Sequence, residues 1–339
     1  MESVELTLET VTPLFLGGAD QQLELRPPSV RGALRFWLRA ALGSVVGRND
    51  LAQLRELESS VFGNTERGSP IVVRFRGALG TADYFDLDKD TQGRQRRTGH
   101  NYLYYSTRLG ANRRVPFQPA KSDLALTLAI RPGADTAMDS LHKAVASAWL
   151  MTHLGGLGTR ARRCGGSLQV SSGSYADLPD FIIRVREPAE LKRHLESGLR
   201  QLLSLMGDRQ PPSTAFDVLH PDTCRIWVLA SSASWPTWKD AVNGLGDAMQ
   251  KFRASQGPQR NEMNSVFGLP ILHGPKHGLQ RRASPLWLRV TKLASERHVG
   301  VATLFQADFT RNGHQVGGGY AHIEKFIASF PVSLEVDYR

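Results

Sequence analysis

The chain has 339 residues, of which 41% are hydrophobic, enough apolar material for one large domain or two of ordinary size. Two cysteines exclude a disulfide framework and a four-cysteine zinc site, and no segment approaches the roughly 18 apolar residues of a membrane span. The acidic first residues also lack the apolar run of a signal peptide, so we expect a soluble, cytoplasmic protein.

The charge balance is strongly basic. Lysine and arginine number 42 against 32 acidic residues, which gives a formal net charge of +10, and 33 of the 42 are arginine. Arginine grips phosphates through paired hydrogen bonds and stacks on bases, whereas lysine acts as a point charge. This bias favours a nucleic-acid partner, although a GC-rich genome would produce the same composition.

In the first half, alternating polar and apolar residues predict a strand over residues 3–12. A helix is expected next, with Ser29 as its N-cap and Gly43 as its stop. Strands follow at 71–79 and 123–130, then a helix over 137–154 and a strand entered through residues 165–170. The order β-α-β-β-α-β is the ferredoxin-like pattern, whose sheet recurs in RNA-binding modules.

The second half repeats this alternation loosely, after a helix at 188–206 and a turn-rich linker at 207–212. Strands are predicted at 225–230, 286–293, 299–306 and 332–336, with helices at 235–253 and 320–329. The expected fold class is therefore α+β, with two ferredoxin-like (RRM-like) domains packed together. We place their boundaries at residues 1–186 and 187–339.

Three arginines in the first predicted helix share one strip of its surface. Arg31, Arg35 and Arg39 follow i, i+4, i+8 spacing, and no carboxylate is interleaved with them. Such a row repels itself, so we expect something anionic against it. The alternative is a solvated face whose long arginine stems cover apolar surface.

Residues 83–122 are too long for an ordinary connection and read as an inserted basic arm. We expect an outer clamp on RNA, with Tyr102 or Tyr105 stacking a base. The arginines of this clamp are Arg94, Arg96, Arg97, Arg113 and Arg114.

A glycine-arginine loop over residues 155–167 (GGLGTRARRCGGS) lies between a predicted helix and a strand. Glycines allow close approach of a bulky partner and expose backbone N–H groups, and arginines add charge, so the loop is suited to phosphate. The alternative is a tight turn with surface arginines. The candidate RNA-binding residues here are Gly155, Gly156, Gly158, Arg160, Arg162 and Arg163.

Catalytic signals are weak. Only His100 and His153 lie in surroundings that suit proton transfer from a 2′-hydroxyl, and a lone histidine is more often structural. His273 and His277 are separated by Gly274 and Pro275, which excludes a helical metal motif. We expect no catalytic residue, no metal and no cofactor.

Several further segments can be read together: 10–15 (TVTPLF) with 17–18 (GG), 29–39 (SVRGALRFWLR), 62–63 (FG) with 69–71 (SPI), 155–167, 267–270 (FGLP) and 281–286 (RRASPL). Together they resemble the RAMP superfamily of CRISPR proteins, and within it the first subunit of the type III-B (Cmr) effector complex. Cys164 stands where that family is expected to have glycine.

The resemblance implies two ferredoxin-like domains in a non-catalytic subunit that contacts the 3′ part of the guide RNA, helps capture target RNA and assembles with other subunits. Two alternatives stay open. One is a metal-independent endoribonuclease that matures guide RNA, which needs His100 or His153 as a base. The other is a scaffold that binds only protein neighbours.

Overall fold

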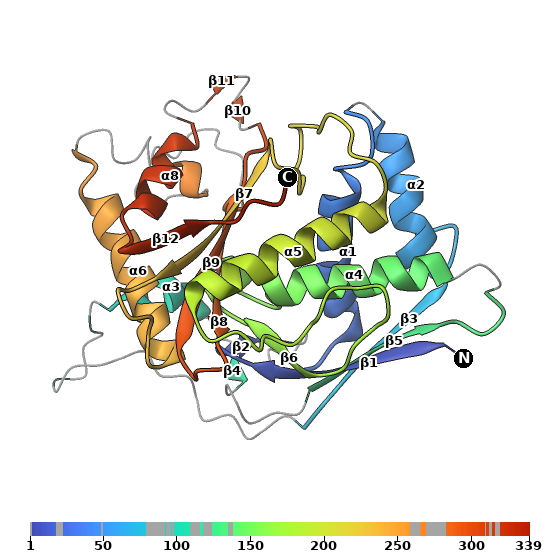
Figure 1. The fold of residues 1–339 in the computed structure, drawn as a ribbon, viewed down its shortest axis with the longest axis horizontal. Helices are drawn as coiled ribbons and strands as arrows, with labels where there is room; N and C mark the ends of the chain where they lie inside the picture. Colours follow the sequence, from blue (N-terminus) through green and yellow to red (C-terminus); the bar gives the residue numbers. More distant parts are fainter. Residues whose placement is uncertain are drawn as a thin grey trace.

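The protein is a mixed α/β structure with two four-stranded antiparallel sheets (Figure 1). The computed structural model describes residues 2–17, 23–48, 50–78, 92, 96, 98–108, 116–117, 124–134, 138–257, 265–268, 283–308, 310–311, 314–315 and 319–339. No helix among these residues is long and apolar enough to cross a lipid bilayer.

The first sheet has the strand order β3-β5-β1-β6. Its inward side chains, such as Val4, Leu6 and Leu8, are buried in one cluster with Trp37 and Trp149 of the covering helices. The elements of this half are β1 (Ser3–Thr10), β2 (Leu14–Phe15), α1 (Pro27–Leu42), α2 (Leu51–Phe62), β3 (Ile71–Arg76), α3 (Gly99–Tyr104), β4 (Pro116–Phe117), β5 (Leu124–Ile130), α4 (Met138–Leu154) and β6 (Leu168–Ser172).

The second sheet has the order β12-β7-β9-β8; strands β7, β9 and β8 are buried on both faces, whereas the edge strand β12 is partly exposed. Ile226 and Val228 of β7 belong to the same core as the first half, whereas Trp227 and Leu229 belong to a second core. Burial on both faces explains the continuous apolar runs in these strands. The elements are α5 (Pro188–Met206), β7 (Cys224–Ala230), α6 (Trp238–Ala254), β8 (Leu286–Lys292), β9 (His298–Phe305), β10 (Thr310–Arg311), β11 (His314–Gln315), α8 (Ala321–Ala328) and β12 (Val332–Glu335).

The predicted strands and long helices are present, with ends that shift by a few residues. One prediction about a helix end is wrong: the N-cap position of α1 is Arg26, whose side chain makes no capping hydrogen bond, and Ser29 lies inside the helix. Proline is well tolerated in the first turn, because its missing N–H has no intrahelical partner there, so the helix begins at Pro27.

The sequence reading missed helix α2 altogether. Asp50 caps it, since its side chain accepts a hydrogen bond from the Gln53 backbone N–H at 2.8 Å. Leu54, Val61 and Phe62 are buried on its inner side. This helix matters because it forms the wall opposite the arginine strip of α1.

Candidate nucleic-acid interface

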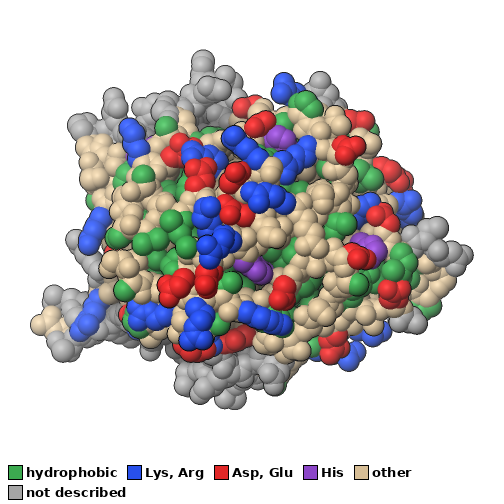
Figure 2. Space-filling model, in the orientation of Figure 1, with side chains coloured by type: hydrophobic (Ala, Val, Ile, Leu, Met, Phe, Trp, Pro, Cys, Tyr) green, Lys and Arg blue, Asp and Glu red, His purple; other side chains and the backbone are tan. Residues whose placement is uncertain are grey.

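Basic and acidic side chains are interspersed on the face shown in Figure 2. Several of the cations near α5 are bound within the protein: Arg200 donates to the Asp337 carbonyl at 2.6 Å, and Lys192 pairs with Glu196 at 2.6 Å. An unbalanced group of cations lies elsewhere, between α1 and α2.

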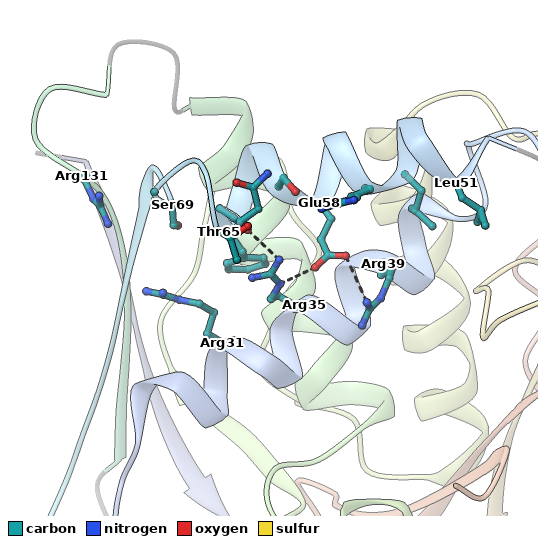
Figure 3. A pocket seen from close by; sticks show the side chains of 15 residues that line it. Arg31, Arg35, Arg39, Leu51, Glu58, Thr65, Ser69 and Arg131 are labelled. Carbon is teal, nitrogen blue, oxygen red and sulfur yellow. Dashed lines mark hydrogen bonds and ion pairs between the residues drawn. The ribbon is translucent and has the colours of Figure 1, made fainter. Parts of the chain in front are cut away.

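A cavity of about 730 Å³ separates α1 from α2 and the loop that follows it (Figure 3). The predicted strip lines one wall, since Arg31, Arg35 and Arg39 all border this space. Arg55 on α2 and Arg131, directly after β5, add two further guanidinium groups that sequence reasoning did not select. The sequence thus predicted the arginines on the α1 wall of the cavity, and the fold adds α2, the loop after it and Arg131.

Glu58 is the one carboxylate among the residues that line this cavity, and it is buried. Its Oε1 lies 2.6 Å from the Arg35 Nε, and its Oε2 lies 3.6 Å from an Arg39 nitrogen. Arg35 also donates to the Gly63 carbonyl at 2.9 Å. Five arginines against one glutamate leave the lining with a formal charge of +4.

The other three arginines make no ion pair with any residue that the structure describes. The Nε of Arg31 is buried and has no hydrogen-bond partner there. A buried N–H donor without a partner is costly, and an anion in the cavity would satisfy it. Arg31, Arg55 and Arg131 are therefore the groups best placed to take a ligand.

The glycine-arginine loop lies at the junction of the two halves. Arg162 stacks on Trp287 at 4.4 Å and on Phe36 at 5.2 Å, and it donates to the Ser284 carbonyl. Arg163 donates to the carbonyls of Phe267 at 2.8 Å and Leu286 at 3.1 Å, and burial lowers its pKa to about 10. These two side chains join the second half to the first.

The loop glycines pack closely against other residues of the protein. A side chain at Gly155 would collide with the Trp37 ring, and one at Gly156 would press on the Gly166 carbonyl. Gly158 has a φ of +83° and packs against the Phe15 carbonyl. Cys164 has a φ of 64°, a left-handed conformation that favours glycine, which fits the glycine that the resemblance expects there.

The two arginine groups do not line one cavity, because no residue of the loop is among those bordering the α1–α2 space. The glycine-arginine loop and the arginine strip of α1 therefore do not share this cavity. The reason is that Arg162 and Arg163 point toward β8 and its neighbours, where backbone carbonyls accept their protons.

Only part of the predicted arm lies within the described residues. Its helix α3 packs on α6, with the His100 N–H donating to Asn243 at 2.8 Å and Arg253 donating to the Tyr102 hydroxyl at 2.7 Å. Arg160 lies 4.9 Å over the exposed Tyr105 ring. Arg96 is exposed; the remaining clamp residues, Arg94, Arg97, Arg113 and Arg114, lie outside the described residues.

The two histidines considered for catalysis are both buried, with exposed fractions of 1%. His153 stacks on Trp149 at 3.9 Å, and its Nε2 lies 3.2 Å from the Nε2 of His194. Burial lowers the pKa of His153 well below its usual value, so it is neutral near pH 7. Neither ring borders the arginine cavity. In the described part of the chain, no three metal-binding side chains gather either.

Comparison with known proteins agrees with the fold and the sequence motifs. The RAMP superfamily model matches residues 7–169. The Cmr subunit Cmr1-1 of Pyrococcus furiosus is 26% identical over 323 residues, 91% of this chain and 88% of that protein. Its Cmr1-2 is 31% identical over 186 residues, 48% of this chain and 92% of that protein.

Solved structures share the fold. The apo crystal structure of Cmr1 from Pyrococcus furiosus matches with a TM-score of 0.70 and 22% identity, over 99% of both chains. A chain of the type III-B Cmr-beta complex bound to cognate target RNA matches with a TM-score of 0.62 and 11% identity, over 97% of this chain and 99% of that one. The chain therefore belongs to the RAMP superfamily and, within it, to the Cmr1 family.

Proposed function

We propose that this protein is a non-catalytic RNA-binding subunit of a type III-B CRISPR effector ribonucleoprotein. It contacts the 3′ part of the guide RNA and helps capture target RNA, in the cytoplasm and beside other subunits of the complex. Membership of the Cmr1 family supports this role, as does the fold shared with a chain of a target-RNA-bound Cmr complex.

The arginine cavity is the observation that carries the proposal. Its lining holds five guanidinium groups and one carboxylate, and Arg31 carries a buried donor without a partner among the described residues. An arginine guanidinium donates two parallel hydrogen bonds to the oxygens of a phosphate, so a segment of RNA backbone fits the chemistry of this cavity. Such contacts position a strand without reading its sequence.

We infer that residues 1–186 and 187–339 are two ferredoxin-like domains. The strand orders β3-β5-β1-β6 and β12-β7-β9-β8 both correspond to the order 4-1-3-2 of a β-α-β-β-α-β unit, which supports this inference. RRM domains stack bases on aromatic side chains of the sheet. In the strands of the first sheet the one aromatic, Phe75, is buried in the core, which favours the α1–α2 cavity over the sheet face.

The endoribonuclease alternative has little support, because a buried neutral His153 cannot reach a strand at the surface. The protein-only scaffold differs from our proposal in one respect: the cavity would receive a carboxylate from a neighbouring subunit rather than phosphate. Ultraviolet crosslinking in the assembled complex distinguishes them. We expect crosslinks to the 3′ half of the guide RNA, and their absence would overturn the proposal.

Salt dependence gives a second test with the full chain. If about five phosphates of a single strand are neutralised, the logarithm of the association constant falls with log salt at a slope of about −3.5. The variant Arg31→Ala should make the slope shallower, from about −3.5 to about −2.8, since each lost phosphate contact accounts for about 0.7. Arg193→Ala, an exposed arginine on α5, is the matched control. A flat salt response contradicts phosphate binding.

A further inference from the structure

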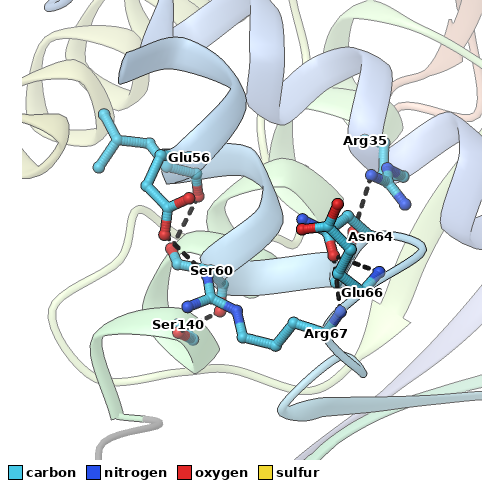
Figure 4. Close-up of polar contacts among 9 residues, drawn as sticks. Arg35, Glu56, Ser60, Asn64, Glu66, Arg67 and Ser140 are labelled. Atoms are coloured by element: carbon cyan, nitrogen blue, oxygen red, sulfur yellow. Dashed lines mark hydrogen bonds and ion pairs between the residues drawn. The ribbon is translucent and has the colours of Figure 1, made fainter. Parts of the chain in front are cut away.

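A second cavity, of about 420 Å³, adjoins the arginine cavity. The two share Gly68, Ser69 and Arg131 in their linings. The far side of the second cavity is formed by Asp139 and Ser140 at the start of α4 and by Ser60 near the end of α2. Figure 4 shows Ser60 and Ser140 beside Arg67, which is held by Glu56 at 3.0 Å.

The hydrogen bonds made by Ser60, Ser140 and Asp139 determine which acceptors remain for a ligand. The Ser60 hydroxyl donates its proton to the Leu57 carbonyl at 2.8 Å, and the Ser140 hydroxyl donates to the Ser60 carbonyl at 3.1 Å. Each hydroxyl has a single proton, so both oxygens keep lone pairs that can accept a hydrogen bond. Asp139 is a carboxylate and adds acceptors only, one of them bound to Lys143 at 2.5 Å.

Arg67 and Arg131 also line the second cavity, but Arg67 is paired with Glu56, and the far side differs in its chemistry from the first cavity. The first is lined by donors and suits phosphate, whereas the far side of the second presents acceptors and suits a hydroxyl donor. A ribonucleotide carries these two features side by side, as a phosphate and a 2′-hydroxyl on the same sugar. Deoxyribose keeps the phosphate and lacks the donor.

We propose that the paired cavities hold one ribonucleotide of a single strand, with its phosphate among the arginines and its 2′-hydroxyl donating to Asp139, Ser60 or Ser140. The inference rests on the proposed RNA-binding function and adds a sugar subsite to it. The subsite makes the protein prefer RNA over DNA independently of base sequence.

The test measures binding of the full chain to one labelled single strand in three forms: RNA, DNA, and RNA with 2′-fluoro sugars. The 2′-fluoro group keeps the RNA sugar pucker but cannot donate a hydrogen bond. One hydrogen bond of ordinary net strength corresponds to about three- to tenfold in Kd, so RNA should bind tighter than the 2′-fluoro strand by that factor. DNA should bind no better than the 2′-fluoro strand.

Variants separate the subsite from the phosphate contacts. Asp139→Asn and Ser140→Ala should each reduce the ratio of the RNA and 2′-fluoro Kd values toward one. Arg31→Ala should weaken binding of both strands equally and leave the ratio unchanged. Asp240→Asn is the matched control, because Asp240 also lies in the first turn of a helix, α6. It should alter neither the affinity nor the ratio.

The outcomes distinguish the two proposals. Equal Kd values of the wild-type chain for RNA and the 2′-fluoro strand, both salt-dependent, would overturn the sugar subsite and leave the RNA-binding function standing. No saturable binding of any strand would overturn both. A preference for RNA that survives both Asp139→Asn and Ser140→Ala would place the discrimination elsewhere and refute this subsite.

Discussion

Glu58 Oε1 lies 2.6 Å from Arg35 Nε, and the same carboxylate reaches Arg39 through its second oxygen. One buried acid on α2 thus orients two arginines of α1 while three others keep their charge unpaired within the described residues. We interpret Glu58 as a positioning residue that spaces the guanidinium groups of the cavity.

Glu58→Gln tests this relationship. Loss of the buried carboxylate should lower the free energy of unfolding by about 1–3 kcal/mol, because Arg35 loses its charged partner. Affinity for single-stranded RNA at low salt should rise by up to about fivefold, since a unit charge 4 Å away across water is worth about 1 kcal/mol. Urea unfolding and fluorescence anisotropy measure the two effects.

Glu56→Gln is the matched control for that variant. Glu56 lies on the same helix, its side chain is 68% exposed, and its partner Arg67 is 53% exposed. An exposed pair of this kind contributes less than about 1 kcal/mol. If the two variants lose equal stability, Glu58 has no special role in holding the cavity.

Arg163→Ala should act on stability rather than on RNA binding. The substitution removes the donors that satisfy the carbonyls of Phe267 and Leu286, at a cost of about 2–4 kcal/mol. Urea unfolding should show this loss, while Arg193→Ala, at an exposed position of α5, should change stability by less than about 0.5 kcal/mol. A drop in RNA affinity with unchanged stability would instead support the phosphate-binding loop predicted from the sequence.

Stability should fall in mild acid because of the histidine pair between α4 and α5. His153 Nδ1 lies 2.9 Å from the Trp149 carbonyl and so donates, which leaves its Nε2 to accept from His194. Burial lowers the pKa of both rings, and the unfolded value is about 6.5. Below that pH the unfolded chain binds protons that the folded chain does not, so each histidine lowers the free energy of unfolding by up to about 1.4 kcal/mol per pH unit.

Urea unfolding at pH 7 and pH 5 measures this dependence. His153→Asn keeps a donor for the Trp149 carbonyl and removes the titrating ring, so it should flatten the change between the two pH values. His142→Asn, on the same helix but away from the pair, should leave the change intact. If His153→Asn leaves the change in the free energy of unfolding between pH 7 and pH 5 unaltered, His153 is not the cause of the acid dependence.

Both cysteines should be unreactive in the folded protein. Burial raises the pKa of the Cys164 thiol to about 12 and also raises that of Cys224 above its usual value, so neither forms thiolate at pH 8. A disulfide-exchange reagent such as 5,5′-dithiobis(2-nitrobenzoate) should titrate no thiol in the native state and two in urea. One rapidly reacting thiol in the native protein would show that a cysteine side chain is accessible.

The amino-acid sequence determined the strands, the long helices and the arginine strip of α1, because these depend on the spacing of neighbouring residues. It also carried the segments that identify the family. It did not reveal helix α2, whose first residue Leu51 is exposed and whose buried positions include the charged Glu58, so its apolar pattern is weak.

The contacts that each arginine makes depend on residues far away in the sequence. Glu58 is 23 residues from Arg35, and the carbonyl that accepts from Arg163 belongs to Phe267, 104 residues further along the chain. Local periodicity places a side chain on a face of its own helix or loop, but which distant segment packs against that face depends on the whole core. Two arginine-rich segments of similar composition therefore acquired different roles: one lines an open cavity, and the other joins the two halves.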